Sequence, residues 1–308
     1  ASMPLIIQEY EQNNLSLDTK LKTLFPKKRL LDKSDISLKD MLSHYARLRP
    51  WIPFYKETLN RKEKPKSRFY KKKERKRFST TVSNNLFLKN KYQEDIFDLI
   101  IESELRDTLE FKYSDLPFYL IKYWIEDRYQ EKLDVLAEKR IFEKLNLKRT
   151  MFNPFQKISI DNVVPSEKDE FFRYGKLQGY VHDEGAAMLG GVSGHAGLFS
   201  NSYEVALMLQ TFLQGGVYNG IRLFDKESFD QFNYCYYCDK GNRSGAGFDK
   251  PQLEGKHGST FGGVSEKSFG HYGYTGSIAW ADPDEQIIFV FLSNRTYPTR
   301  ENTLLQTS

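Results

Sequence analysis

The order of helical and strand-like patterns along the chain limits its fold more than any other feature. Apolar residues between 96 and 101 repeat at helical spacing, and similar stripes occur through the first two thirds of the sequence. Near the C-terminal end, segments 274–280 and 287–292 are rich in β-branched and aromatic residues and flank the turn-forming run 282–285. Helices followed by a hairpin, without an internal repeat, predict an α+β fold.

The sequence also marks where several helices begin and end. Asn201 followed by Glu204 is similar to a capping box, and Gly215 with Gly216 would end that helix. Pro117 belongs in a first helical turn, because its missing N–H would be unpaired there anyway. The other helices are expected at residues 4–10, after Ser37, after Gln93, after Ser114 and Asp115, and up to about Leu147.

Positive charge is concentrated in one segment. Residues 61–77 contain 11 Lys or Arg and 2 Asp or Glu, a net charge of +9, whereas the whole chain carries +5. A protein that binds nucleic acid usually spreads its cations over a face and adds aromatic side chains that stack on bases. We therefore expect no nucleic-acid partner. Residues 50–90 lack clear periodicity, and we interpret them as a long solvated excursion from the fold.

The two cysteines, Cys235 and Cys238, allow several interpretations. A Cys-x-x-Cys pair can be a redox dithiol or half of a zinc site. A tetrahedral zinc site needs two further ligands, and the nearest histidine, His257, stands alone. Buried thiols or a local disulfide are the expected alternatives, and we expect neither a metal nor a cofactor. No apolar run approaches the roughly 20 residues of a membrane-spanning helix, so we expect no transmembrane segment.

Three segments combine glycine with side chains that can do chemistry: 113–115, 190–200 and 269–277. Glycines beside a strand let a ligand or another backbone come close. Spacing alone does not make a catalytic triad of their residues. Each candidate also has a structural alternative, namely a helix-end aromatic for Tyr113, a brace of the glycine-rich turn for His195 and an exposed strand residue for His271.

These segments resemble the serine β-lactamase and penicillin-binding-protein superfamily, in the class C-related branch of esterases and D-amino-acid peptidases. The resemblance covers nearly the whole chain apart from the basic segment. It implies a β-lactamase-like fold, with an antiparallel sheet flanked by helices plus an all-helical lobe. It rests on the runs 14–18, 42–44, 178–184, 189–200, 270–276, 280–283 and 292–295.

The resemblance also implies how the chain is divided. Residues 1–308 would form a single β-lactamase-like domain that is incomplete at both ends. The helical lobe would span about 19–200 and carry the basic insert 56–90. The α/β lobe would combine 1–18 with 201–308.

Catalysis in this family uses Ser-x-x-Lys, Tyr-x-Asn and Lys/His-Thr-Gly motifs. By resemblance, Tyr113 would relay the proton, Asp115 would be a polar orienter where asparagine is common, and His271 would lie on the substrate-side strand. A phenol titrates near 10, so a tyrosine base needs a neighbouring cation that lowers its pKa. The implied substrate-binding residues are Tyr272 in place of the usual threonine or serine, Gly273, Tyr274 with its backbone N–H as an oxyanion donor, and His195.

The sequence departs from the family pattern at the nucleophile. No serine is followed by lysine three positions later, and no Gly-x-Ser-x-Gly occurs. Two interpretations stay open: the catalytic serine lies upstream in a longer polypeptide, or the chain is a non-catalytic relative that keeps the cleft. In either case we expect that these 308 residues alone do not hydrolyse a substrate by the family mechanism.

The resemblance finally suggests partners and a location. The substrate would be a small molecule or peptidoglycan-like compound with an ester, amide or similar acyl group, and the location the periplasm or cell envelope. An upstream catalytic domain of the same polypeptide is a further expected partner. If upstream strands are absent, the hairpin at 274–292 has an unpaired edge, which would favour a homodimer.

Overall fold

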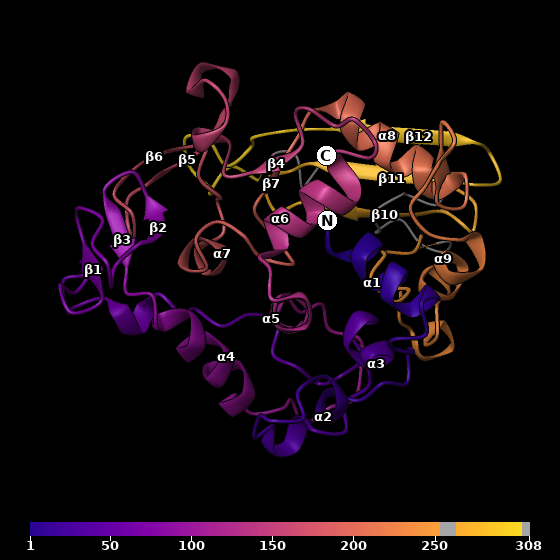
Figure 1. The fold of residues 1–308 in the computed structure, drawn as a ribbon, viewed down its shortest axis with the longest axis horizontal. Helices are drawn as coiled ribbons and strands as arrows, with labels where there is room; N and C mark the ends of the chain where they lie inside the picture. The colour runs from indigo at the N-terminus through magenta and orange to yellow at the C-terminus, as the bar shows by residue number, and fades with distance from the viewer. Residues whose placement is uncertain (253–262, 304–308) are drawn as a thin grey trace.

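Most of the helices lie in the first part of the chain and a three-stranded sheet with two five-residue strands lies near its C-terminal end, as the computed structural model shows (Figure 1). It describes residues 1–252 and 263–303, so His257 lies outside the described residues. The fold is α+β, as the sequence predicts. The described helices are α1 (Ser2–Glu11), α2 (Leu21–Leu24), α3 (Leu38–Leu42), α4 (Tyr92–Glu102), α5 (Leu116–Tyr129), α6 (Leu133–Ala137), α7 (Glu184–Met188), α8 (Ser202–Leu213) and α9 (Lys226–Asn233).

The strands pair into small antiparallel sheets. One has the order β1-β3-β2 and another the order β10-β11-β12, and the remaining strands pair as β4-β7, β5-β6 and β8-β9. Their bounds are β1 (Tyr70–Lys71), β2 (Thr80–Ser83), β3 (Leu86–Leu88), β4 (Met151–Phe152), β5 (Pro165–Asp169), β6 (Gly175–Gln178), β7 (Leu198–Phe199), β8 (Val217–Tyr218), β9 (Ile221–Arg222), β10 (Phe269–Tyr272), β11 (Ile278–Asp282) and β12 (Ile287–Phe291).

The predicted C-terminal hairpin is present as β11 and β12, but its first strand begins later than expected. Residues 274–277 form a turn instead, because the N–H of Gly273 donates to the carbonyl of Ser277 over 2.7 Å. Gly276 has a φ of +90° in this turn, which favours glycine over residues with a Cβ. The turn joins β11 to β10, so the strand with His271 lies beside the hairpin.

An aromatic cluster joins the sheet to the helices. The helix α8 packs along β11 and β12 (Figure 1). Phe212 lies on this helix, and the centroid of its ring is 5.1–6.2 Å from the centroids of four other rings. Stabilising aromatic pairs typically have this separation. These rings come from the loop before α9, from α9, from the loop after it and from β10, namely Phe224, Phe229, Phe248 and Phe269.

The helix caps agree with the sequence in part. Ser37 and Asp40 form a capping box at α3. Asn201 accepts a hydrogen bond from the N–H of Glu204 over 2.8 Å, as expected at α8. The Glu204 carboxylate, however, accepts from the backbone N–H of Lys148 and from the hydroxyl of Thr150 instead of returning to the cap. This side chain therefore ties α8 to the segment before β4.

The interpretation of residues 50–90 as an excursion without regular structure is wrong in part. This segment contains the three-stranded sheet β1-β3-β2, whose inner side chains Tyr70, Val82 and Leu88 are buried. Strands of two to four residues are too short to show a period, and the many Lys and Arg between them hide the pattern. The basic segment is therefore a folded arm, which extends away from the β10-β11-β12 sheet (Figure 1).

Two further expectations concern the cysteines and the membrane. Cys235 and Cys238 form a disulfide, which confirms the local-disulfide alternative. Among the helices of the described residues, none is both long and apolar enough to span a bilayer.

The edge of the C-terminal sheet remains open within the described part of the chain. β12 is the edge strand, and Ile287, Phe289 and Phe291 point their side chains to solvent. The homodimer through this edge stays a prediction. In a two-fold antiparallel pairing, Phe289 would face its own copy and Ile287 would face Phe291, with no charged side chain between them.

This pairing can be tested with one substitution. Phe289→Lys places a charge in the middle of the edge, so the variant should elute as a monomer where the unchanged protein elutes as a dimer. Size-exclusion chromatography with light scattering measures both masses. A monomeric unchanged protein, or equal masses for the two, would contradict the prediction.

Candidate active site

Two of the predicted catalytic side chains, Tyr113 and His271, lie ring to ring although they are far apart in the sequence. Their ring centroids are 5.8 Å apart and the planes are tilted by 58°. Tyr113 precedes α5, and His271 lies on β10. The Tyr113 residue is 37% exposed and His271 is also exposed, so a solute can reach both side chains.

Hydrogen bonds from a distant segment fix the turn that carries Tyr113. The N–H of Ser114 donates to Nδ1 of His44 over 3.2 Å, and the N–H of Asp115 donates to the carbonyl of Pro50 over 3.0 Å. The His44 ring also lies 4.6 Å from the Tyr113 ring. Asp115 occupies the N-cap position of α5, but its side chain makes no capping hydrogen bond. Its carboxyl group instead interacts with the phenol of Tyr113.

The electrostatics of the turn keep the phenol of Tyr113 protonated. Burial, followed by the charges of Asp115, Asp249 and Asp183, raises the pKa of Tyr113. Burial also raises the pKa of the Asp115 carboxyl, which interacts with the phenol. Tyr113 would accept a proton only after a further cation approached it.

His44 is the neutral partner of this turn. It is buried, and burial together with the charge of His271 lowers the pKa of His44 to about 3. Its Nδ1 accepts the hydrogen bond from Ser114, so the proton of the neutral ring is on Nε2. A neutral imidazole at this position adds no positive charge that could lower the pKa of Tyr113.

The end of β10 presents the predicted substrate contacts. His271 Nδ1 lies 2.7 Å from the carbonyl of Tyr272, and because a carbonyl only accepts, Nδ1 carries the proton. In a neutral ring this leaves the lone pair of Nε2 for a ligand. Gly273 starts the turn that follows, and the exposed Tyr274 stacks on His182 with 5.5 Å between ring centroids. Contact of these residues with a substrate stays a prediction.

His195 lies behind this surface rather than on it. Its Nε2 contacts Asp183 Oδ1 over 2.9 Å, its Nδ1 contacts Ser193 Oγ over 2.9 Å, and its ring stacks on Tyr119. Burial acts to lower the pKa of His195, but the Asp183 carboxylate outweighs it and the pKa is raised. Both ring nitrogens have partners within the protein, which favours the structural alternative of a brace for the glycine-rich turn.

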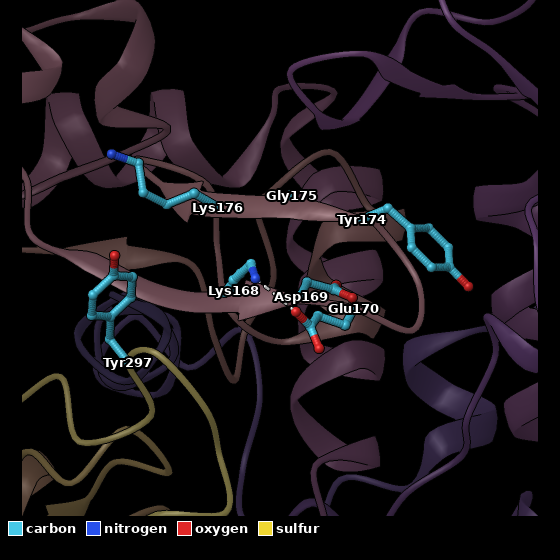
Figure 2. Close-up of a pocket in the computed structure, with 7 residues that line it drawn as sticks. All are labelled: Lys168, Asp169, Glu170, Tyr174, Gly175, Lys176 and Tyr297. Atoms are coloured by element: carbon cyan, nitrogen blue, oxygen red, sulfur yellow. Dashed lines mark ion pairs between the residues drawn. The ribbon is translucent and has the colours of Figure 1, made fainter.

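The described part of the structure has two hollows of interest, and only one of them is lined by a predicted site residue. The larger, about 570 Å³, lies along the β5-β6 hairpin and contains the Lys168–Glu170 ion pair (Figure 2), but none of the predicted site residues. The smaller, about 350 Å³, lies between α5, α8 and β10, so we assign the candidate site to it. Its lining includes Ala1, Ser2, Phe118, Gly194, His271 and Ala279.

A family model agrees with the fold. The model described as Beta-lactamase matches residues 5–307, which is nearly the whole chain. The chain belongs to the Beta-lactamase family. The chain is 32% identical over 201 residues to the N-acetylmuramyl-L-alanine amidase of Bacillus subtilis strain 168, covering 60% of this chain and 44% of that protein. It is 33% identical over 198 residues to a protein of Escherichia coli K12 that is provisionally named D-alanyl-D-alanine carboxypeptidase, covering 60% and 45%.

Solved structures share the fold of this chain. A penicillin-binding protein from Bacillus halodurans superposes with a TM-score of 0.62 at 13% identity, covering 95% of this chain and 77% of that one. A penicillin-binding-protein homologue from Caulobacter crescentus gives 0.61 at 14%, covering 95% and 74%. The chain spans less than half the length of the curated relatives it matches.

Sequence reasoning missed three residues of the candidate site of this Beta-lactamase-family chain. His44 was noted only within the family-like run 42–44, without a role. Asp183 was part of another such run, and Asp249 was not noted at all. Asp249 reaches the site because it forms a bridge with Gly270 beside His271, a long-range pairing without a local sequence signal. A histidine inside a family-like run was the one signal that could have found His44.

The Asp183–His195 pair predicts how stability depends on pH. Burial acts to raise the pKa of Asp183, but His195 outweighs it and lowers this pKa from 3.8 to about 2. A carboxyl whose folded-state pKa is depressed stabilises the fold above its unfolded pKa and loses this as pH falls through the folded value. The free energy of unfolding should therefore drop by about 2 kcal/mol between about pH 4 and pH 2 from this group.

Urea denaturation at several pH values measures this effect. Asp183→Asn should flatten the dependence between about pH 4 and pH 2, whereas Asp161→Asn, at an exposed site, should leave it unchanged. An unchanged slope in Asp183→Asn would contradict the assignment.

Proposed function

We propose that this chain forms the substrate cleft of a serine hydrolase that transfers an acyl group from an amide, ester or peptidoglycan-like substrate to a serine. The observation that carries the proposal is the contact of Tyr113 with His271, 5.8 Å apart, beside a cavity that His271 lines. In the proposal Tyr113 relays the proton and Asp115 orients it. His271, Tyr272 and the turn that follows hold the substrate.

The cavity supports a position for the nucleophile. Ala1 and Ser2 line it together with His271. A Ser-x-x-Lys directly before Ala1 would enter the same cavity, which is where the family resemblance aligns that motif. Its lysine would be the cation that the phenol of Tyr113 needs in order to accept a proton. The backbone N–H of Tyr274 is then the proposed oxyanion donor.

The names of the relatives support the substrate class. One is an N-acetylmuramyl-L-alanine amidase and another carries the provisional name of a D-alanyl-D-alanine carboxypeptidase. Both names refer to amide bonds of cell-wall peptides. We propose the same class here, with a place in the cell envelope. Within the cell envelope, we propose the periplasm as the compartment.

A covalent label tests the proposal. A polypeptide that includes the residues before Ala1 should bind a fluorescent penicillin or fluorophosphonate covalently, and the labelled peptide should contain a serine upstream of Ala1. The 308 residues alone should stay unlabelled. Labelling of the 308 residues would overturn the position of the nucleophile.

The second candidate function is a cleft that binds its ligand without catalysis. The same experiment distinguishes it from the hydrolase. If the longer polypeptide is not labelled but binds a muramyl peptide in calorimetry, the chain is a binding domain. The departures Tyr272 and Tyr45–Ala46–Arg47 from the family pattern are the observations that favour this candidate.

A further inference from the structure

The basic arm formed by residues 61–77 has no part in the proposed catalysis. It carries 11 Lys or Arg and 2 Asp or Glu, so the rest of the chain has a net charge of −4. In Figure 1 the arm lies at the end of the molecule opposite the β10-β11-β12 sheet. A separate explanation is needed for so much charge of one sign on one element.

The arm is folded, so its cations are held on a fixed support. Tyr70 is buried, its hydroxyl lies 2.7 Å from Thr58 Oγ1, and its ring contacts Phe172. The Lys64 ammonium lies 3.3 Å from the centre of the Tyr174 ring, and the Tyr174 hydroxyl donates to the carbonyl of Glu63. The arm is thereby tied to the β5-β6 hairpin, next to the larger hollow shown in Figure 2.

In the part of the chain that the structure describes, the cations of the arm lack carboxylate partners. Elsewhere, exposed lysines commonly have one, for example Lys22 with Asp35 and Lys267 with Asp284. Within the described residues, no Lys or Arg of 61–77 forms an ion pair. Nine of them are exposed, namely Arg61, Lys62, Lys64, Arg68, Lys72, Lys73, Arg75, Lys76 and Arg77.

Like charges held this close repel one another, which destabilises the folded arm unless a bound anion neutralises them. A row of exposed cations binds a polyanion by releasing its counterions, and the guanidinium groups among them match phosphate oxygens in pairs. The unpaired cations on a rigid support therefore favour a polymer with repeated phosphate groups.

The side chains between the cations narrow the choice of polymer. Binding of single-stranded nucleic acid uses exposed aromatic rings that stack on bases. Phe69 and Phe78 are half-buried, and Arg68 and Lys71 lie over their rings at 4.7 and 5.1 Å. No large apolar side chain of 61–77 is exposed, whereas insertion into a membrane surface requires one. A hydrophilic polymer therefore fits the arm better than a single-stranded nucleic acid or a membrane surface does.

We propose that the arm 61–77 is a docking surface for a hydrophilic polymer of repeating phosphodiester groups that carries no nucleobases, such as a polyol phosphate. The polymer lies along the exposed Lys and Arg side chains and makes contact through its phosphates. This function is independent of the acyl-transfer proposal, because the arm contains none of the residues placed at the cleft.

Fluorescence anisotropy with labelled poly(glycerol phosphate) tests the docking surface on the folded chain. The unchanged protein should bind at 50 mM salt and lose at least tenfold in affinity at 200 mM salt. Lys72→Glu, Lys73→Glu and Arg75→Glu together should weaken binding at 50 mM salt at least tenfold and reduce the salt dependence. Circular dichroism should show the same fold for this variant.

A control with the same change in net charge separates the arm from the protein's overall charge. Lys27→Glu, Arg29→Glu and Lys144→Glu together change exposed residues outside the arm, and this variant should bind within threefold of the unchanged protein. If the two variants lose the same affinity for the polymer, the proposal is overturned. It is also overturned if the unchanged protein does not bind the polymer. Tighter binding to duplex DNA, or to phosphatidylglycerol vesicles, overturns it in favour of that partner.

Discussion

Tyr113→Phe should lower the rate of serine acylation by about 10²- to 10⁴-fold, the usual contribution of a positioned acid–base group. The substitution removes only the hydroxyl, while the ring keeps its contacts with His44 and His271. The measurement is the rate of covalent labelling of a polypeptide that includes the upstream serine. Substrate affinity should change much less than the rate, because the phenol acts on the proton.

Two controls make this result specific to the hydroxyl. Tyr203→Phe, at an exposed position on α8, should label at the unchanged rate. Thermal melting should show that Tyr113→Phe is as stable as the unchanged protein. A folded Tyr113→Phe that labels at the unchanged rate would show that Tyr113 is not the relay, and the binding-domain candidate would gain support.

Asp169→Ala should destabilise the fold by about 3–5 kcal/mol, because it leaves the buried charge of Arg173 without its partner. Both side chains are fully buried, and Arg173 Nε donates to Asp169 Oδ2 over 2.6 Å. The same guanidinium donates to the carbonyls of Val181 and His182. It therefore joins the β5-β6 hairpin to the segment that leads into Asp183.

Urea denaturation measures this change in the free energy of unfolding. The matched control is Glu170→Ala on the same hairpin, which breaks the exposed Lys168–Glu170 pair and should leave stability nearly unchanged. Equal effects of the two substitutions would mean that the buried pair is not a main support of the hairpin. Activity of Asp169→Ala below its melting transition would show whether the cleft depends on the pair.

Local patterns in the sequence predicted the parts of the fold that depend on neighbouring residues. The apolar stripe of α4 and the capping residue Ser37 are where the sequence places them, and the hairpin β11-β12 is present with its first strand starting at Ile278 instead of 274. Each depends on periodicity, capping or turn chemistry within about ten residues. The sheet β1-β3-β2, which includes part of the arm, was missed because its strands have only two to four residues and its burial comes from residues outside the segment.

The sequence by itself determined the α+β order, the family motifs around Tyr113 and His271, and the concentration of charge in 61–77. Only the tertiary structure decided that the rings of Tyr113 and His271 lie side by side, that both ring nitrogens of His195 have partners within the protein, and that His44 and Asp249 lie close to the candidate site. Side-chain contacts and pKa values depend on burial and on charges brought together from distant segments. No local window of sequence contains that information.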